Sequence, residues 1–146
     1  MKGTLFFVFV LLFTGNVFAD NSKTADEYFK KANEYFDKKD YKTAVLYLDS
    51  TIEANPEHKE AYAFRGVCKY ELKQYRAAIE DFDLALILVK GYAEVYFYRG
   101  LCHKELGEDK MACDDWTEAY NLGLKKALDF LMEYCKMEND KKGKKK

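Results

Sequence analysis

The side chains of this sequence that could do chemistry are four cysteines and two histidines. Cysteine and histidine can form a nucleophile–base pair or ligate a metal ion when their spacing brings them together. The sequence has no Cys-x-x-Cys motif and only two histidines, which are far apart. Cys102 and His103 are adjacent, so on a helix they would point about 100° apart and could not act as a pair. We therefore predict no catalysis, no metal site and no cofactor.

Some of these residues lie in a segment that occurs twice in the sequence in similar form. The segment "YAFRGVCKYEL" begins at Tyr62, and "YFYRGLCHKEL" begins 34 residues later, at Tyr96. A shift of 34 residues also aligns a third, earlier segment. The aligned positions are Tyr28/Tyr62/Tyr96, Ala32/Gly66/Gly100, Ala44/Ala78/Ala112, Leu48/Phe82/Trp116 and Thr51/Ala85/Ala119. Small and bulky apolar positions of this kind indicate a duplicated scaffold rather than a duplicated site.

Within each copy, apolar residues recur at intervals of three and four, which predicts two amphipathic helices per copy. Short polar breaks at residues 37–40, 73–74 and 107–109 separate the two helices. Pro56, Gly91 and Gly123 stand where the copies end, and Gly or Pro just past a helix stops it. The small aligned residues allow two antiparallel helices to approach closely, and stacked hairpins bury an apolar face that one hairpin cannot.

The pattern resembles the motif of tetratricopeptide repeat proteins, over about 100 residues and three copies of the repeat. The resemblance implies an all-α, right-handed α-solenoid with repeats at about 25–58, 59–92 and 93–123. Lys69 and His103 depart from the motif, which has an aromatic residue there. The chain is most similar to small exported bacterial members, in which a last repeat like residues 112–123 runs into a final helix. That helix, at about 124–137 here, is expected to cap the open end of the solenoid.

The cysteines allow more than one arrangement. Cys68 and Cys102 are repeat equivalents, so we expect them about 10 Å apart, beyond the reach of a disulfide of about 7 Å between Cα atoms. Cys113 opens the second helix of the last repeat and Cys135 ends the capping helix, which favours a Cys113–Cys135 disulfide. A Cys102–Cys113 contact across one hairpin is a second option. In the third, all four are buried thiols that pack as small apolar side chains.

In this family the first helix of each repeat lines a concave groove. Besides Ala63, the resemblance places these residues there: Asp26, Phe29, Asn33, Phe36, Asp37, Glu60, Val67, Tyr70, Glu71, Glu94, Phe97, Leu101, Lys104 and Glu105. Helical spacing supports the assignment, because residues 26, 29, 33 and 37 share one face. Carboxylates around aromatic side chains predict a protein or peptide partner with basic and apolar residues. The alternative is ordinary solvated charge beside aromatic residues half buried between helices.

One ligand of the family is disfavoured. Members that bind the carboxylate end of heat-shock chaperones use Lys, Arg and Asn in this groove. Here only Asn33 matches, while Phe29, Ala63 and Phe64 stand where cations or amides would be needed. An acidic groove also repels a carboxylate.

The two ends of the chain differ from its body. Lys2, the apolar run 5–13 and the Val17-Phe18-Ala19 triplet predict a secretory signal peptide at residues 1–19, cleaved near Ala19. The alternative is an uncleaved membrane anchor. Residues 138–146 are predicted to be a disordered Lys-rich tail whose lysines could touch an anionic membrane. Residues 20–135 hold 17 basic and 23 acidic side chains, a charge that does not favour nucleic acid.

We therefore expect an exported, non-catalytic interaction module, periplasmic or secreted, that acts as a scaffold for a protein or peptide. The alternatives are a self-associating module of the cell envelope and an accessory subunit of an envelope enzyme complex. The sequence does not specify the oligomeric state.

Overall fold

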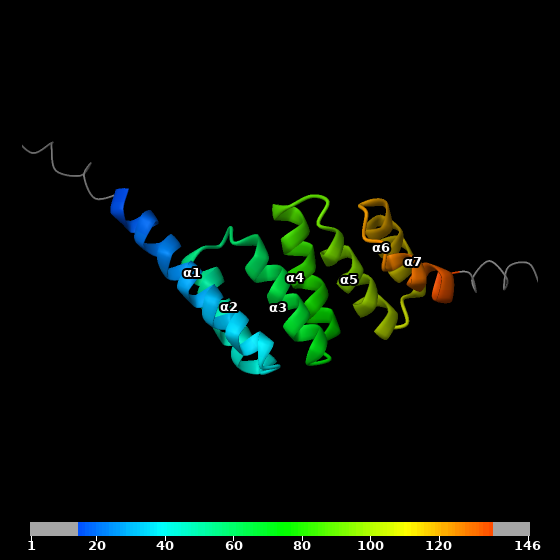
Figure 1. The fold of residues 1–146 in the computed structure, drawn as a ribbon, viewed down its shortest axis with the longest axis horizontal. Coiled ribbons are helices and arrows are strands. Elements are labelled where there is room, and N and C mark those ends of the chain that lie inside the picture. Colours follow the sequence, from blue (N-terminus) through cyan, green and yellow to red (C-terminus); the bar gives the residue numbers. More distant parts are fainter. Residues whose placement is uncertain (1–14, 136–146) are drawn as a thin grey trace, which may run out of the picture.

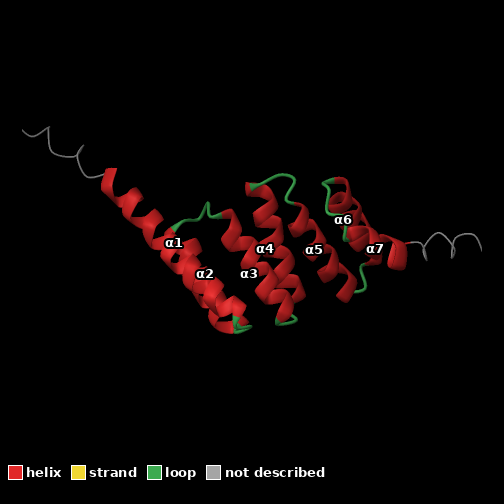
Figure 2. Cartoon of the chain, in the orientation of Figure 1, coloured by secondary structure: helices red, strands yellow, loops and turns green. Residues whose placement is uncertain are grey.

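The computed structural model describes residues 15–135 and contains only helices and turns in this range (Figures 1 and 2). The helices are α1 (Gly15–Asp37), α2 (Tyr41–Ala54), α3 (Lys59–Glu71), α4 (Tyr75–Leu88), α5 (Ala93–Glu105), α6 (Asp109–Asn121) and α7 (Ala127–Phe130), followed by the π-helical turn η1 (Leu131–Cys135). Most of the predicted signal peptide and the whole predicted tail lie outside the described residues. Because α1 begins at Gly15, it runs through the predicted cleavage position.

Three antiparallel hairpins, α1–α2, α3–α4 and α5–α6, stand side by side, which confirms the predicted all-α solenoid (Figure 1). Contacts form mainly between consecutive helices, as expected for a repeat array. The turns within the hairpins lie along one edge, the lower edge of Figure 2, and the loops between hairpins lie along the opposite edge. Equivalent residues of the three repeats therefore form rows across the molecule.

The turns within the hairpins share one backbone device. Lys39, Lys73 and Gly107 are repeat equivalents. All three adopt the left-handed backbone conformation, with φ values of 60°, 61° and 74°, respectively. A residue in this conformation ends the first helix and redirects the chain into the second. In the first repeat Asp40 then caps α2 by accepting a hydrogen bond from the Thr43 amide at 3.2 Å.

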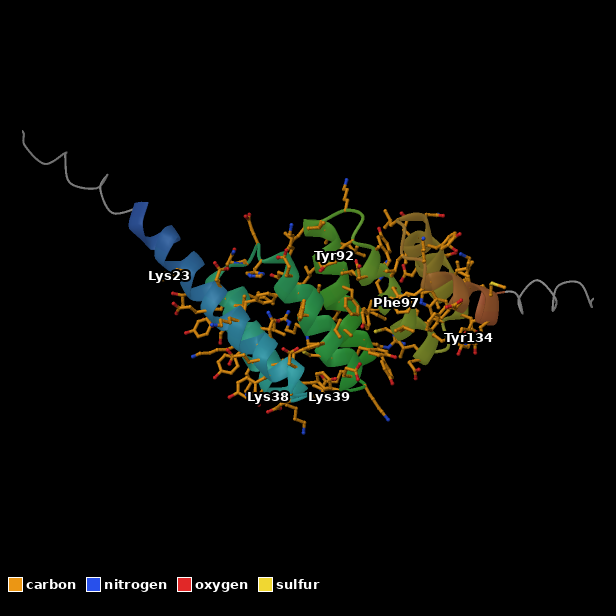
Figure 3. The ribbon with its side chains drawn as sticks, in the orientation of Figure 1. Lys23, Lys38, Lys39, Tyr92, Phe97 and Tyr134 are labelled. Carbon is orange, nitrogen blue, oxygen red and sulfur yellow. A yellow bond between two sulfur atoms is a disulfide. The ribbon has the colours of Figure 1, made fainter. Side chains whose placement is uncertain are left out.

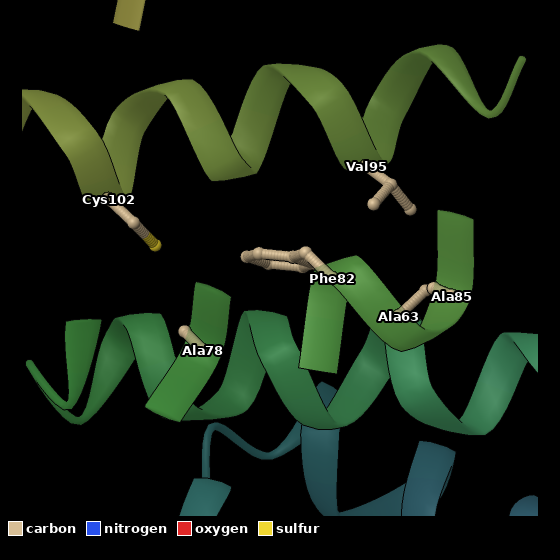
Figure 4. Packing of buried hydrophobic residues seen from close by; sticks show 6 residues of the cluster. All are labelled: Ala63, Ala78, Phe82, Ala85, Val95 and Cys102. Carbon is tan, nitrogen blue, oxygen red and sulfur yellow. The ribbon is translucent and has the colours of Figure 1, made fainter. Parts of the chain in front are cut away.

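The core consists of three apolar clusters, one at each of the two junctions between repeats and one between the last hairpin and the C-terminal cap. In the middle cluster, the ring of Phe82 from α4 lies between α3 and α5 (Figure 4). Gly66 makes room for this ring, since a Cβ added there would stand 2.5 Å from the Phe82 Cε1 atom. Gly100 does the same for Trp116, at 2.6 Å from the indole nitrogen. The small–bulky alternation of the sequence is thus a close helix crossing.

Buried charges tie neighbouring hairpins together. The Arg65 guanidinium of α3 donates to both carboxylate oxygens of Asp81 on α4, at 2.9 and 2.6 Å, and to Asp49 on α2 at 2.6 Å. The Asp81 side chain is 3% exposed, and the Lys69 ammonium lies 2.8 Å from it. A buried carboxylate requires such partners, so Lys69 departs from the aromatic motif because it helps to neutralise Asp81.

The same network recurs one repeat later. Arg99 binds Asp115 at 2.9 and 2.6 Å and Asp83 at 2.6 Å. His103, the equivalent of Lys69, has its Nε2 atom 3.8 Å from Asp115. The second departure from the motif therefore also lies beside a buried carboxylate.

The capping element begins about three residues later than the sequence predicts. The expected helix covers about 124–137, but α7 begins at Ala127 and passes into η1 at Leu131. Gly123, with a φ of +96°, ends α6, and the Leu124 amide then donates to the Ala119 carbonyl, so the chain turns before it can start a new helix. Residues 136 and 137 lie outside the described residues.

The structure contains a Cys113–Cys135 disulfide, with 5.8 Å between the two Cα atoms. It joins the end of η1 to α6. Cys68 and Cys102 are free and buried.

Candidate partner-binding groove

The first helices of the three hairpins enclose an apolar hollow of about 210 Å³, which we call the central hollow. Its lining comes from α1, α3 and α5, with Phe82 at its base and residues next to α5 at one end: Phe36, Ala63, Phe64, Val67, Phe82, Tyr92, Glu94, Val95 and Tyr98. Phe36 and Phe64 meet edge to face, with ring centroids 5.4 Å apart. The hollow therefore has rigid aromatic walls, which suits an apolar side chain of a ligand.

A second hollow, of about 450 Å³, adjoins the first at Tyr92 and Glu94, which line both. It is formed by the start of α3, the α4–α5 loop and the α6–α7 loop, and Tyr92 lies on that side of the molecule in Figure 3. The two hollows lie next to each other, and we refer to them together as the groove, which extends from α1, α3 and α5 toward the α6–α7 loop. A groove of this form can take an extended segment longer than one residue.

Carboxylates surround the groove at both edges. Asp37, Glu71 and Glu105 end α1, α3 and α5, respectively, and are exposed. Within residues 15–135, none of these three forms a salt bridge with a Lys or Arg side chain. Burial raises the pKa of Tyr70, and the charges of Glu105 and Glu71 raise it further; the Tyr70 ring packs on Tyr98, which lines the central hollow.

The opposite edge of the groove also carries carboxylates. Burial, followed by the charges of Glu60 and Glu94, raises the pKa of Tyr92. His58 lies 3.9 Å from Asp26 and 3.6 Å from Glu60, and its ring packs on Phe29 with centroids 4.6 Å apart. Asp26 and Glu60 therefore already share a partner within the chain, whereas Glu94 has no salt bridge to any described side chain.

The structure brings some of the predicted residues together in the groove and separates others from it. Phe36, Val67 and Glu94 line the central hollow, as predicted. Asn33 lies one helical turn before Phe36, and its Oδ1 atom is buried without a hydrogen-bond partner in the described structure. Asn33 lines neither hollow, so this buried acceptor is not part of the surface that a ligand would contact.

The prediction for Phe97 requires a correction. Its side chain is only 5% exposed, because Phe130 packs edge to face on it at 4.9 Å between centroids and the Lys126 ammonium lies 4.2 Å above its ring. Figure 3 shows Phe97 between α5 and the C-terminal helices. The equivalent Phe29 packs on His58 and on Phe64 of α3, whereas the equivalent Ala63 lines the central hollow, so the two phenylalanines at this register position serve stacking.

Two neighbours of Phe97 on α5 are also engaged within the chain. Leu101 packs on the C-terminal core cluster. Lys104 pairs with Asp109 at 2.8 Å, and its ammonium lies 4.9 Å from the Tyr134 ring centroid. Neither therefore contributes a free side chain to the groove.

Two aromatic residues of the groove, Tyr92 and Tyr98, do not follow from the sequence reasoning, which placed Phe64 there only as a residue unsuited to bind a carboxylate. Phe64 and Tyr98 are repeat equivalents inside the duplicated segment, so an aromatic pair at the 34-residue interval is a signal that could have identified Tyr98. Tyr92 precedes α5, outside any helical face, and no periodic pattern identifies such a residue.

The cysteines and histidines offer no catalytic arrangement in the described range. Burial raises the pKa of both Cys68 and Cys102 to about 12, so their thiols remain protonated and unreactive at neutral pH. His103 is held by Glu108, 2.7 Å from its Nδ1 atom. Residues 15–135 contain no group of three or more His, Cys, Asp or Glu side chains arranged to hold a metal ion. None of the described helices combines the length and apolar character needed to cross a membrane.

Solved structures similar to this chain are tetratricopeptide repeat (TPR) domains. The first TPR domain of Spaghetti (RPAP3), bound to the HSP90 peptide SRMEEVD, has a TM-score of 0.77 and 23% identity, covering 81% of this chain and 95% of that domain. The Arabidopsis OM64 TPR domain has a TM-score of 0.73 and 24% identity, covering 77% and 98%, respectively. The TPR2B domain of yeast Sti1, in complex with pHsp70, has a TM-score of 0.68 and 23% identity, covering 71% and 83%.

No family model matches the sequence, and no curated protein matches it. The likeness in structure establishes that the chain has the TPR fold.

Proposed function

We propose that this chain is a non-catalytic protein–protein interaction module that binds a peptide or protein segment carrying basic and apolar residues in the groove of α1, α3 and α5. The observation that carries the proposal is the apolar central hollow, which Glu94 lines, with Glu71 and Glu105 beside Tyr70, whose ring packs on Tyr98 of the hollow. None of these three carboxylates is in a salt bridge with a described residue. An apolar anchor would fill the hollow, and Lys or Arg side chains would pair with the carboxylates.

The charge of the groove favours a ligand of opposite charge to the peptide bound in one of the similar structures. The peptide SRMEEVD, bound by the Spaghetti (RPAP3) domain, has three acidic side chains among its last four residues. In the present chain such a segment would meet Glu71 and Glu105 at one edge and Glu94 at the other. Like charges at short range repel, so the groove favours a basic segment over an acidic one.

We also propose that the chain is exported and works outside the cytoplasm, in the periplasm or after secretion. The predicted signal peptide is the main support, and the Cys113–Cys135 disulfide adds to it because disulfides persist in oxidising compartments. Cell fractionation with N-terminal sequencing of the isolated protein tests this. A new N-terminus near Asp20 is expected, whereas an intact Met1 in the cytoplasmic fraction contradicts export.

A selection of random displayed peptides on the full chain tests the ligand specificity of the groove. We expect enriched peptides to combine Lys or Arg with an apolar residue, and SRMEEVD to be bound much more weakly. In fluorescence anisotropy, Glu71→Lys with Glu105→Lys should weaken binding of an enriched peptide by about tenfold or more. The matched control is Glu53→Lys with Glu80→Lys, which makes the same charge change on exposed sites of α2 and α4.

The control should leave affinity within about twofold, since distant surface charges are screened at physiological salt. Enrichment of acidic peptides contradicts the proposed specificity. Equal losses in both double variants also contradict it, because they would show a response to net charge alone.

The natural partner can be approached with a photo-crosslinking residue at Val67, in the hollow, compared with one at Leu46, which is 66% exposed on α2. We expect capture from Val67 only, at a partner segment with basic and apolar residues when the crosslink is mapped. Capture of the chain itself alone favours the self-associating alternative.

A further inference from the structure

The groove has one edge at which negative charge is repeated in register. Asp37, Glu71 and Glu105 are equivalent at the 34-residue interval, and each is the last residue of its helix. We call these three residues the acidic edge. Negative charge is unfavourable at the C-terminal end of a helix, because the helix dipole is negative there. Helix stability therefore does not explain this row.

The acidic edge is continuous with the apolar part of the groove. Tyr70, which lies beside Glu71 and Glu105, packs on Tyr98 of the central hollow with ring centroids 6.1 Å apart. Burial and then the charge of Glu105 raise the pKa of Tyr75, and Glu105 itself is exposed. A cationic segment along the edge would thus also contact the aromatic wall.

The described chain ends beside this edge. The Tyr134 ring lies 4.9 Å from the ammonium of Lys104, the residue before Glu105. The pKa of Tyr134 is raised, first by its hydrogen bond to Glu133 and in part by the charge of Glu105. Tyr134 is therefore close enough to Glu105 to respond to its charge. The disulfide from Cys135 to Cys113 pins the point from which the next residue must start.

The sequence that follows has the complementary charge and enough length. Residues 136–146 carry six lysines against Glu138 and Asp140. Eleven residues can span up to about 36 Å when extended. Neighbouring helices lie about 10 Å apart, so the ends of α5, α3 and α1 are spread over roughly 20 Å. The segment can therefore reach every carboxylate of the acidic edge from its pinned start.

We propose that residues 136–146 dock in cis on the acidic edge, across Glu105, Glu71 and Asp37, and compete there with the basic segment of a partner. This regulation rests on the proposed function, because it assigns the same groove to both. The tethered segment acts at a high effective concentration, so a weak contact suffices to raise the threshold for partner binding. Because it is electrostatic, docking weakens as salt screens the charges.

The first experiment needs no partner. A carbodiimide that joins Lys to Glu or Asp without a spacer is applied to the dilute full chain, and crosslinked peptides are mapped by mass spectrometry. We expect links from lysines 141–146 to Glu71 and Glu105 in the monomer band. Glu71→Gln with Glu105→Gln should remove them, and the control Glu80→Gln should not. Links found only in a dimer band overturn docking in cis and assign the segment to a second copy.

The second experiment measures competition, with an enriched basic peptide as the probe. Deletion of residues 139–146 should tighten peptide binding by about three- to tenfold at low salt, and the difference should vanish near 0.5 M salt. A variant with lysines 141, 142, 144, 145 and 146 replaced by Gln should behave like the deletion. Unchanged affinity in both variants overturns the competition.

The two experiments distinguish failure of the proposed function from failure of the regulatory proposal. If no basic peptide binds either form of the chain, the proposed function fails, while the crosslinks still report whether the segment docks. If peptides bind but no link to the acidic edge forms, the regulatory proposal alone is wrong.

Discussion

At the scale of single residues, the close contact between Gly66 and Phe82 sets two effects against each other. Alanine in a helix interior is favoured over glycine by about 1 kcal/mol. A Cβ at position 66 would stand 2.5 Å from the Phe82 ring, however, and overpacking of a core costs about 1–3 kcal/mol. We expect Gly66→Ala to lower the free energy of unfolding by about 1–2 kcal/mol, measured by urea denaturation.

The same substitution has the opposite sign when the ring is removed. In a Phe82→Leu background, Gly66→Ala should be neutral or stabilising, since helix propensity then acts without the clash. An equal loss of stability in both backgrounds would show that the Phe82 ring is not the cause.

The buried thiols give a pH dependence at the same scale. Burial raises the pKa of Cys68 and Cys102 from 9.0 to about 12, so the folded state holds these protons more tightly than the unfolded state. Their contribution to stability is complete below pH 9 and is lost as the pH rises toward about 12, because only the unfolded state gains by ionising. The wild type should lose more stability between about pH 8 and pH 10.5 than Cys68→Ala with Cys102→Ala. If urea denaturation shows the same loss of unfolding free energy with pH in both proteins, the prediction is wrong.

At the scale of the hairpin, the same set of equivalent positions is occupied by charged side chains in one repeat and by aromatic side chains in another. In the second repeat it holds Arg65, Lys69 and Asp81; in the first repeat the equivalents are Lys31, Tyr35 and Tyr47. Tyr35 and Tyr47 stack with ring centroids 5.3 Å apart, and the Lys31 ammonium lies 5.7 Å from the Tyr47 ring centroid. An aromatic stack therefore occupies the place that a charge network holds in the second and third repeats.

We expect Asp81→Asn to lower the free energy of unfolding by about 2–4 kcal/mol, because it leaves Lys69 without its carboxylate partner and Arg65 with Asp49 alone. Replacing all three residues together, Arg65→Lys, Lys69→Tyr and Asp81→Tyr, should cost less than Asp81→Asn alone. The Lys69 and Asp81 charges are removed together, and the ammonium kept at position 65 can lie over the new ring, as Lys31 lies over Tyr47. Thermal and urea unfolding of both variants measure this. A larger loss for the triple replacement would show that the two chemistries are not interchangeable.

At the scale of the whole molecule, the cap closes one end of a linear array. α7 and η1 cover Trp116 and Phe97 through Phe130, and the Cys113–Cys135 bond holds them there. Cys113→Ser with Cys135→Ser should reduce stability by about 3 kcal/mol, the expected effect of a disulfide that closes a loop of this size. Faster amide hydrogen exchange should begin in α5–α7 and leave α1 and α2 nearly unchanged, since each hairpin contacts only its neighbours.

A reductant should reproduce this effect in the wild type and add nothing to the double Ser variant. Exchange that accelerates equally in all three hairpins would contradict local opening of the cap.

The sequence by itself determined the repeats, the helical hairpins and the solenoid. These follow from contacts that are local along the chain: apolar spacing within a helix, a small residue opposite a bulky one, and turn residues at a constant interval. A period of 34 residues with Gly66 and Gly100 opposite Phe82 and Trp116 leaves few other ways to bury the apolar faces. The sequence also indicated the acidic character of the groove, through Glu71, Glu94 and Glu105.

Tertiary structure alone decided which side chains remain available to a ligand. Phe36 and Phe97 look alike as aromatic residues on first helices, yet the central hollow exposes one and Phe130 covers the other. The repeat pattern also could not show that Phe64, Tyr92 and Tyr98 converge from three segments, or that Asp81 is buried beneath Arg65 and Lys69. Availability depends on how far each helix is rotated against the next hairpin, and that rotation is set by packing between segments distant in sequence.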